Sequence, residues 1–542
     1  MEIIAVKDLN FTYPGCEDRA LKNINFSVDA GQFVVICGAT GSGKSTLLRM
    51  LKREISPLGE RTGSIYFKGE ELGSISDFTA ATCIGYVMQR PEQQLVTDKV
   101  WHELAFGLEN LDYPQPVMRR RVSEMAAYFG IEDWYEKRVD ELSGGQKQLL
   151  NLAAVMVMQP DVLILDEPTA QLDPIAAADF LSTVYKLNRE TGLTVILVEH
   201  RLEDAIPLCD RLLVLKDGEV LTYDEPRKVC NDLRSYPDLL EAMPASVRVH
   251  NAVGSSAECP LTVREGRDFI QNNFTNNVRT IERECHAVSE EPALEFRDIW
   301  FRYTRETPDV LKGTDVTINK GEVFCILGGN GSGKSTFLSV ASGINRAYSG
   351  TVKVLGKKIG EYKNQSLYRN CLTLLPQDVQ TVFLHPTVRQ ELEECGADVS
   401  MIPYDVEKLL DKHPYDLSGG EQQLVALAKV LATSPKILLM DEPTKGIDAH
   451  SKKGIAETVK KLKADGMTVV IVTHDVEFAA DIADRCAMFF RGEFTSVDVP
   501  EEFFAWNNFY TTVVNRMTRG YYDHIVTVDD AVKVISLNGG KK

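Results

Sequence analysis

The sequence predicts an α/β fold that occurs twice in one chain of 542 residues. Apolar segments with the length of strands alternate with helical patterns in both halves, as in sheets that are covered by helices. Each half also contains a glycine-rich loop directly after an apolar strand and, further along, the sequence Leu-Ser-Gly-Gly. Because these features recur in the same order, we expect two tandem domains of one architecture.

The repeat sets the expected bounds of the two copies. Copy one is expected to cover residues 1–226 and to open with strands at Ile3–Val6 and Ile24–Val28. Copy two is expected to cover residues 292–500 and to open with a strand at Leu294–Phe296. Both openings alternate between apolar and polar residues, as half-buried strands do.

Two segments lie outside the repeat. Residues 227–291 are polar and contain turn residues, which is typical of a flexible linker or of a small appended module. Residues 501–542 form a C-terminal tail to which the sequence assigns no role. Apolar positions favour partial order in the first segment; they are Leu239, Leu240, Val247, Val249 and Val263.

The bulk composition excludes several classes of protein. A formal net charge of −18 argues against nucleic acid as a partner, because its phosphates repel such a surface. No apolar run approaches the roughly 18 to 20 residues that span a bilayer, and the N-terminus lacks a signal segment. We therefore expect a chain that stays in the cytosol.

The eleven cysteines form no Cys-x-x-Cys pair, which supports neither a disulfide framework nor a zinc knuckle. Cys37 and Cys325 lie in the apolar runs that lead into the two glycine-rich loops. We interpret them as buried core residues. A redox switch beside the loops is the alternative, and it rests on position alone.

The two glycine-rich loops, Gly38–Ser45 and Gly328–Ser335, match the pattern GxxxxGK[ST]. In such a loop, backbone N–H groups point at phosphate oxygens, and the following helix adds its positive end. The lysine then reaches the β- and γ-phosphates, and the serine can ligate Mg²⁺. The predicted nucleotide-binding residues of the loops are Gly38, Gly41, Gly43, Lys44, Ser45, Thr46, Gly328, Gly331, Gly333, Lys334, Ser335 and Thr336.

A buried apolar strand ends in two carboxylates in each copy, at Asp166 and Glu167 and again at Asp441 and Glu442. One such pair in isolation would be interpreted as acids that cap a strand. After a phosphate-binding loop, we expect the aspartate to hold the Mg²⁺ shell. The glutamate is expected to accept a proton from an attacking water.

A histidine follows a further apolar strand in each copy. His200 comes 33 residues after Glu167, and His474 comes 32 residues after Glu442. A single histidine at a strand end is most often a satisfied polar terminus. The recurrence of the spacing favours a γ-phosphate sensor or a group that positions water.

Gln89 and Gln377, each after an apolar strand, are further candidates for contact with Mg²⁺ or with the attacking water. From the serine of Leu-Ser-Gly-Gly to the strand-end aspartate, both copies have 23 residues. From the loop lysine to that serine, copy one has 99 residues and copy two has 84. The shortening falls between Gln377 and Ser418, a region that is mainly helical in copy one at Val117–Phe129. The two halves are therefore expected to present unequal surfaces.

The Leu-Ser-Gly-Gly stretches place a serine three positions before Gln146 in copy one and before Glu421 in copy two. This is the pattern of a capping box at a helix start. Two adjacent glycines cost helix stability, which a cap alone would avoid, and they leave N–H groups open to a phosphate. The predicted phosphate-contacting residues are Ser143, Gly144, Gly145, Ser418, Gly419 and Gly420.

Together these motifs resemble those of ABC-type ATPases: a Walker A loop, a glutamine loop, an LSGGQ signature, a Walker B strand and a switch histidine. The resemblance covers nearly the whole chain in two passes. It implies ATP and Mg²⁺ as cofactors and two tandem P-loop NTPase domains, each with a mixed sheet core and a helical subdomain. It matches Tyr13 and Tyr303 to the aromatic residue that stacks on adenine, and Asp173 and Asp448 to the loop that links the two sites.

The resemblance also implies head-to-tail pairing, in which each ATP lies between the Walker A loop of one half and the signature of the other. Here both halves belong to one chain, so their encounter is intramolecular. Ser143 is then expected to complete the site built on Lys334, and Ser418 the site built on Lys44.

The chain departs from the family pattern at a few positions. Leu149 and Leu424 replace an arginine that commonly follows the signature, and Glu421 stands for the usual glutamine. Arg201 follows the first histidine where aspartate is frequent, whereas Asp475 keeps the pattern in copy two. None of these changes removes a catalytic group, so we expect both sites to be competent.

The stretches Gly85–Val96 and Val100–Asn110 resemble energy-coupling-factor transporter ATPases. This implies a peripheral subunit on the cytoplasmic face of a prokaryotic membrane, working in the import of a vitamin or metal ion. Its partners would be a membrane-embedded coupling subunit and a substrate-binding membrane subunit. The segment after Gln89 would receive the coupling helices of the partner; an ordinary surface helix is the alternative.

Two other functions stay open from the sequence. One is a fused sugar-importer ATPase, although such proteins often carry a degraded site and none is visible here. The other is a soluble tandem ATPase that acts on the ribosome. The acidic charge balance and the scattered cysteines argue against it.

Overall fold

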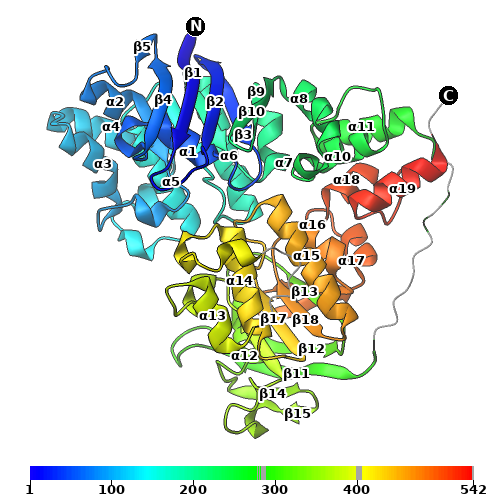
Figure 1. Cartoon of the computed structure of the whole chain (residues 1–542). Helices are drawn as coiled ribbons and strands as arrows, with labels where there is room; N and C mark the ends of the chain where they lie inside the picture. Colours follow the sequence, from blue (N-terminus) through cyan, green and yellow to red (C-terminus); the bar gives the residue numbers. More distant parts are fainter. Residues whose placement is uncertain (277–278, 280, 282–288, 398–405, 540–542) are drawn as a thin grey trace. The chain divides into compact units, whose positions relative to one another are not determined.

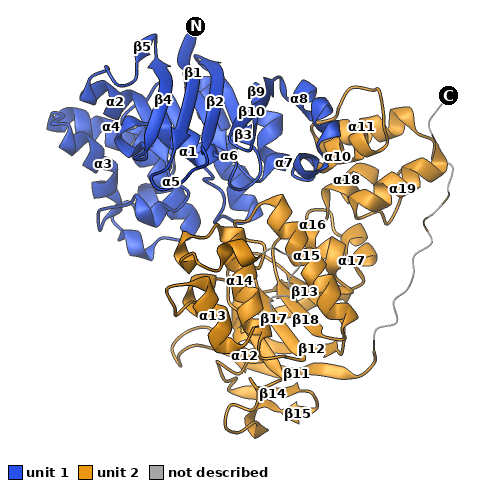
Figure 2. Ribbon diagram, in the orientation of Figure 1, with its two compact units in different colours: residues 1–244 blue, residues 245–542 orange. Residues whose placement is uncertain are grey.

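The computed structural model describes residues 1–276, 279, 281, 289–397 and 406–539. The chain forms two compact units, residues 1–244 and residues 245–542, which Figure 2 shows in blue and orange.

Unit 1 contains two sheets. The first is antiparallel, with the strand order β2-β1-β4-β5. Burial alternates along β2, whereas β1 buries the four residues from Ile3 to Val6 in succession. One face of this sheet packs on the core. The bounds are β1 Glu2–Thr12, β2 Leu21–Asp29, β4 Glu60–Phe67 and β5 Glu70–Glu71.

The second sheet of unit 1 has the order β10-β9-β3-β8-β7-β6 and is parallel except for β10, which pairs antiparallel with β9. Strands β3, β6, β7 and β8 are buried along their whole length, as expected for parallel strands covered on both faces. The bounds are β3 Phe33–Cys37, β6 Ile84–Val87, β7 Val162–Asp166, β8 Thr194–Val198, β9 Arg211–Lys216 and β10 Glu219–Asp224.

The helices of unit 1 cover these sheets (Figure 1). One hydrophobic core joins residues of both sheets with the first helix, so the loop before that helix is anchored from two sides. The bounds are α1 Lys44–Met50, α2 Asp77–Cys83, α3 Val100–Asn110, α4 Gln115–Tyr128, α5 Gly144–Met156, α6 Pro174–Thr191, α7 Leu202–Ala205, α8 Pro226–Asp232 and α9 Pro237–Leu240.

Unit 2 repeats this architecture, with the sheet orders β12-β11-β14-β15 and β16-β17-β18-β13-β19-β20. The first is antiparallel, and the second is parallel except for the β19–β20 pair. The predicted α/β fold in two tandem copies is thereby confirmed. The strand bounds are β11 Pro292–Phe301, β12 Leu311–Asn319, β13 Val323–Leu327, β14 Ser349–Val354, β15 Lys357–Lys358, β16 Leu372–Leu375, β17 Ile437–Asp441, β18 Thr468–Val472, β19 Arg485–Phe490 and β20 Glu493–Asp498.

The helices of copy two differ from those of copy one in two regions. Copy one has α2 before β6, whereas copy two has a 3₁₀ turn at Ile359–Glu361 before β16. The other region follows the glutamine. Copy two has α13 and then a 3₁₀ turn at Val406–Leu409, whereas copy one has α3 and then the long α4. Part of the shortened segment, residues 398–405, lies outside the described residues. The helix bounds are α12 Lys334–Ala341, α13 Val388–Cys395, α14 Gly419–Leu431, α15 Ala449–Ala464, α16 Val476–Ile482 and α17 Pro500–Trp506.

Four further helices of unit 2 form a cluster with its own core, here named the four-helix cluster: α10 Ala245–Ala252, α11 Val263–Asn273, α18 Val513–Thr518 and α19 Val528–Asn538. Figure 1 shows α18 and α19 beside α11. Its core includes Val249 and Ile270 from the segment between the copies, and Met517 and Ile535 from the C-terminal tail. The two segments outside the repeat are therefore ordered in part, and they pack on each other.

Two smaller points bear on the sequence predictions. In the described part of the chain, no helix combines the length and the apolarity needed to cross a membrane. Cys37 and Cys325 are buried in β3 and β13, and burial raises the pKa of both thiols, that of Cys37 to about 12. A buried thiol with a raised pKa is a poor nucleophile, which favours the interpretation as core residues.

Candidate active sites

Each glycine-rich loop connects the end of a central parallel strand to a helix. In copy one, β3 ends at Cys37 and α1 begins at Lys44. Gly38 has φ +149°, and a Cβ there would lie 2.1 Å from the carbonyl oxygen of Leu215. The equivalent Gly328 has φ +154°, and its Cβ would lie 2.3 Å from a backbone oxygen of β19. Only glycine fits at the start of either loop.

The loop lysine is turned across its own loop in both copies. Lys44 Nζ donates to the carbonyl oxygens of Gly38, at 2.8 Å, and Ala39, at 2.9 Å. Lys334 Nζ makes the same two contacts, with Gly328 and Gly329, at 2.8 and 3.0 Å. Each loop thus holds a positive charge among its backbone groups.

The loops are built to receive an anion. Ser42 Oγ and Ser332 Oγ, one in each loop, are buried and have no hydrogen-bond partner among the described residues. Such a hydroxyl costs free energy unless a ligand pairs with it. Together with the lysine and the N-terminus of the following helix, it fits the phosphates of a nucleotide.

The serine after the lysine lies beside the strand-end aspartate. Ser45 Oγ donates to Asp166 Oδ1 at 2.9 Å. In copy two, Ser335 lies beside Asp441 and lowers the pKa of its carboxyl. Burial raises the pKa of both aspartates, and the charge of the neighbouring glutamate raises it further. In copy two, Asp441 Oδ1 is buried without a partner among the described residues. A hydroxyl and a carboxylate at this point fit Mg²⁺, which prefers hard oxygen ligands.

Copy one brings three predicted residues together around one carboxylate. His200 Nε2 lies 2.8 Å from Glu167 Oε1, and Gln89 Nε2 donates to Glu167 Oε2 at 2.7 Å. Burial opposes the charged form of His200, but the hydrogen bond with Glu167 and the negative charge of that residue together outweigh burial and raise the pKa of the imidazole. The predicted glutamine, glutamate and histidine therefore form one cluster.

Copy two forms the glutamate–histidine pair without the glutamine. His474 Nδ1 lies 2.7 Å from Glu442 Oε2, and the backbone N–H of His474 donates to the same oxygen at 3.2 Å. Gln377 is exposed, and no hydrogen bond joins it to Glu442 among the residues that the structure describes. The two candidate sites are therefore similar in plan and different in detail.

The tyrosines assigned to adenine stacking lie beside the loops. Tyr13 Oη and Thr46 Oγ1 are 2.9 Å apart, and Tyr303 Oη and Thr336 Oγ1 are also 2.9 Å apart. The ring of Tyr303 is 61% exposed. An aromatic ring fixed at its hydroxyl end next to a phosphate loop leaves its face available for stacking on a base.

The Leu-Ser-Gly-Gly serines begin helices, as the sequence predicts. Ser143 caps α5 and Ser418 caps α14, each in a full capping box with the residue three positions on. A Cβ at Gly144 would meet no atom within 4 Å, so the backbone there is open. Asp173 and Asp448, which the resemblance assigns to the loop that links the two sites, cap α6 and α15. The signature residues thus expose N–H groups at a helix start.

Two further polar side chains of copy one were not predicted from the sequence. Tyr86 Oη donates to Asp166 Oδ2 at 2.9 Å. Glu199, 2% exposed, accepts hydrogen bonds from the backbone and hydroxyl of Thr169 and from the backbone of His200. Burial raises the pKa of Glu199. The sequence does contain a sign of both residues, since Tyr86 is a polar residue within a buried strand and Glu199 directly follows one.

A phosphate-binding loop, a serine–aspartate pair and a glutamate–histidine pair define a nucleotide-hydrolysing domain, and this chain has two of them. The chain belongs to the ABC transporter family, whose model matches residues 21–170 and 311–445. It is therefore an ATPase that uses ATP with Mg²⁺.

Several relatives span the same length. A protein of Bacillus cereus with the provisional name ABC transporter ATP-binding protein is 38% identical over 98% of this chain and 98% of its own. A protein of Methanosarcina mazei with the same provisional name is 30% identical over 91% of this chain and 88% of its own.

Two solved structures are also similar. The archaeal ribosome recycling factor aABCE1, solved with the ribosomal stalk protein aP1, is 22% identical with a TM-score of 0.58, over 91% of this chain and 90% of the solved chain. That likeness concerns the fold alone. The protein cbiO1 of Clostridium perfringens, described as part of the ABC transporter complex cbiONQ, is 32% identical with a TM-score of 0.39; it covers 44% of this chain and 96% of the solved one.

Proposed function

We propose that this protein is the ATP-hydrolysing subunit of an energy-coupling-factor importer, bound to the cytoplasmic face of a prokaryotic membrane. In this role it couples ATP binding and hydrolysis at two sites to the uptake of a vitamin or a metal ion. A membrane-embedded coupling subunit and a substrate-binding membrane subunit would be its partners. The observation that carries the proposal is a matched pair of loops, one after each glutamine.

In copy one, this loop is held from inside by a buried carboxylate. Glu103, on α3, is 6% exposed and accepts the backbone N–H groups of Val96 and Thr97 at 3.1 and 2.7 Å. The side chain of Val96 is 63% exposed. The loop therefore has a fixed backbone and presents an apolar side chain to the outside.

Copy two has the same arrangement of a buried carboxylate and a loop. Glu391, on α13, is fully buried and accepts the backbone N–H groups of Leu384 and His385, the latter at 2.5 Å. Lys429 pairs with this carboxylate, and the side chain of Leu384 is 79% exposed. Burying a carboxylate is costly, and an apolar side chain in water contributes nothing to folding. In both copies a buried carboxylate fixes the loop backbone, and the loop exposes an apolar side chain. This recurrence supports the proposal that the two loops bind a partner.

The residues of each site support a division of labour in hydrolysis. Lys44 neutralises phosphate charge, and Glu167 accepts a proton from the attacking water while His200 keeps the glutamate in place. Ser45 and Asp166 would hold Mg²⁺, which when bound supplies positive charge to the phosphate oxygens. The matching residues of copy two act in the same way.

In this proposal the halves pair head to tail, and Ser143 completes the site built on Lys334 while Ser418 completes the site built on Lys44. ATP use drives a two-state closing and opening of the halves, and the partner subunit receives that motion. Since α4 of copy one has no described counterpart in copy two, the halves would contact different helices of the partner.

Purification from detergent-solubilised membranes tests the proposal. The tagged full-length chain is expected to carry small integral membrane proteins with it in fixed stoichiometry. Co-sedimentation with ribosomes and no membrane protein would contradict the proposal and favour a soluble ATPase of translation.

Surface variants make the test specific. Val96→Asp and Leu384→Asp place a charge in the proposed contact and are expected to reduce co-isolation sharply. The matched control is Leu58→Asp, because Leu58 is 87% exposed in another part of unit 1. If the control reduces co-isolation as much as the two loop variants do, the loops are not the contact.

A further inference from the structure

One difference between the two strands that lead to the glutamines concerns a tyrosine, which is buried, and a leucine, which is partly buried. Tyr86 on β6 pairs with Ile164 on β7, and Leu374 on β16 pairs with Leu439 on β17. Ile164 and Leu439 both lie two residues before the strand-end aspartate. Tyr86 and Leu374 therefore occupy equivalent places, and only Tyr86 carries a polar atom.

This difference decides how the two aspartates are held. Both oxygens of Asp166 have a protein partner, since Oδ1 accepts from Ser45 and Oδ2 accepts from Tyr86, each at 2.9 Å. Ser335 lies beside Asp441 and lowers the pKa of its carboxyl, but Asp441 Oδ1 is buried with no partner in the described part of the chain. Leucine at position 374 offers no donor to it.

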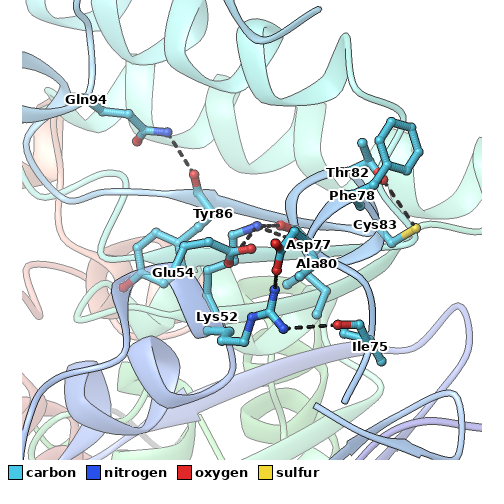
Figure 3. Close-up of polar contacts among 12 residues, drawn as sticks. Lys52, Glu54, Ile75, Asp77, Phe78, Ala80, Thr82, Cys83, Tyr86 and Gln94 are labelled. Atoms are coloured by element: carbon cyan, nitrogen blue, oxygen red, sulfur yellow. Dashed lines mark hydrogen bonds and ion pairs between the residues drawn. The ribbon is translucent and has the colours of Figure 1, made fainter. Parts of the chain in front are cut away.

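The tyrosine is itself fixed by its strand. Figure 3 shows Gln94 with its amide directed at the backbone oxygen of Tyr86, to which Gln94 Nε2 donates at 2.8 Å. Lys52 Nζ donates to the carbonyl oxygen of Ile84, two residues earlier on the same strand, at 2.7 Å. Gln94 Oε1 also accepts from the backbone of Met88 and from Asn151 on α5. Hydrogen bonds from side chains thus fix two carbonyl groups of β6, those of Ile84 and of Tyr86 itself.

Copy two lacks the equivalent of this anchor. The buried carboxylates Glu103 and Glu391 bind loop residues that correspond to each other, so position 94 corresponds to Val382. Valine cannot bridge two backbone groups. The tyrosine and its anchor therefore occur together in copy one and are both replaced by apolar residues in copy two.

We propose that Tyr86 is a positioning residue that holds the carboxylate of Asp166 for the divalent cation, so that the two sites bind the cation with unequal affinity. The inference rests on the proposed roles of Asp166 and Asp441 as metal ligands. A second residue that hydrogen-bonds a ligand orients it, and losing such a residue typically costs about 10- to 100-fold in metal affinity. The site on Asp166 is the tighter one, because its carboxylate is oriented in advance.

The proposal is tested by titrating the full chain with Mn²⁺ in the presence of a non-hydrolysable ATP analogue. Electron paramagnetic resonance measures the bound Mn²⁺. The wild-type chain is expected to show two classes of Mn²⁺ site, and Asp166→Asn is expected to abolish the tighter one. Tyr86→Phe keeps the ring and removes the hydroxyl. It should weaken the tighter class about 10-fold or more and change its spectrum, while the weaker class stays as it was.

The natural difference between the copies supplies a matched variant. Leu374→Tyr introduces the missing hydroxyl beside Asp441, and it is expected to tighten the weaker class. This variant keeps the proposal testable where Tyr86→Phe fails to fold.

Two results would overturn the proposal in distinguishable ways. If Asp166→Asn removes the tighter class but Tyr86→Phe leaves its affinity and spectrum unchanged, Tyr86 has no positioning role. If Asp166→Asn removes no class of metal site, the assigned role of the aspartate itself is wrong.

Discussion

Glu167 and Glu442 have backbone conformations that non-glycine residues rarely adopt. Their φ angles are +48° and +51°, and each lies directly after the last residue of a buried strand. Such a conformation costs about 1–3 kcal/mol and persists only where the surroundings enforce it. Here the backbone N–H groups donate to the carbonyl oxygens of Val198 and Val472, at 2.9 and 2.8 Å. The same conformation recurs at the equivalent residue of both copies, so the same backbone turn holds the two glutamates to which we assign proton acceptance.

Replacing either glutamate by its amide is expected to reduce steady-state ATP turnover by about 10²- to 10⁴-fold, because glutamine cannot accept the proton of the attacking water. Glu167→Gln and Glu442→Gln keep the shape of the side chain, so ATP binding should persist. Phosphate release and nucleotide binding measure the two effects. Glu132→Gln, at an exposed position, serves as control. Hydrolysis that survives either change intact would show that the chain does not need two active sites.

At the residue scale, the sequence predicts those parts of the site that have a fixed spacing. Glu167 and His200 contact each other because both follow parallel strands whose ends share one edge of the sheet. Tyr86 and Glu199 were missed, since a polar residue in a buried strand shows its partner only in three dimensions. For the same reason the exposure of Gln377, in contrast to Gln89, could not be predicted.

At the scale of elements, one hydrogen bond links the helix after the second histidine to the four-helix cluster. Glu477 on α16 accepts the backbone N–H of Val513, the first residue of α18, at 2.6 Å. Desolvation raises the pKa of Glu477 to about 7. The hydrogen bond from Val513 and the charges of Arg248 and Lys452 oppose this shift, and Asp475 adds to it.

This shift predicts a pH dependence of stability in unit 2. The folded state keeps a proton on Glu477 that the unfolded chain loses above its ordinary pKa of 4.5, so stability falls as the pH rises to about 7 and then levels off. The contribution is on the order of 3 kcal/mol. Thermal unfolding from pH 5 to 8 measures it, and Glu477→Gln should flatten the dependence. Glu457→Gln, on the exposed face of α15, should leave it as in the wild type; equal slopes for all three chains would contradict the assignment.

The four-helix cluster also shows where prediction from the sequence ends. Apolar positions such as Val249 predict that the segment between the copies has some order, and helices are found there. They do not say that its partner is the C-terminal tail. Contacts such as Thr275 Oγ1 with the carbonyl oxygen of Asn538, at 2.6 Å, join residues 263 positions apart. No local pattern contains that information.

At the scale of the whole molecule, duplication gives each unit a complete set of loop, acid pair and histidine, while the details differ. In copy one, Tyr86 donates to Asp166, the proposed metal ligand, and Gln89 donates to Glu167. In the described part of copy two, Asp441 Oδ1 has no partner, and no hydrogen bond joins Gln377 to Glu442. The outward surfaces differ as well, because α4 has no described counterpart. We therefore predict an ATPase with two unequal ATP sites, each completed by the Leu-Ser-Gly-Gly signature of the other copy.

Site-directed cross-linking tests that central claim most directly, in a chain whose native cysteines have been replaced. Ser143→Cys lies at the signature of copy one, Asn330→Cys in the phosphate loop of copy two, and Thr40→Cys in that of copy one. With ATP and Mg²⁺ present, the account predicts a cross-link within one chain between positions 143 and 330, and a second between Ser418→Cys and Thr40→Cys. Cross-links between positions 143 and 40, with none between 143 and 330, would show that each copy completes its own site and would contradict the account.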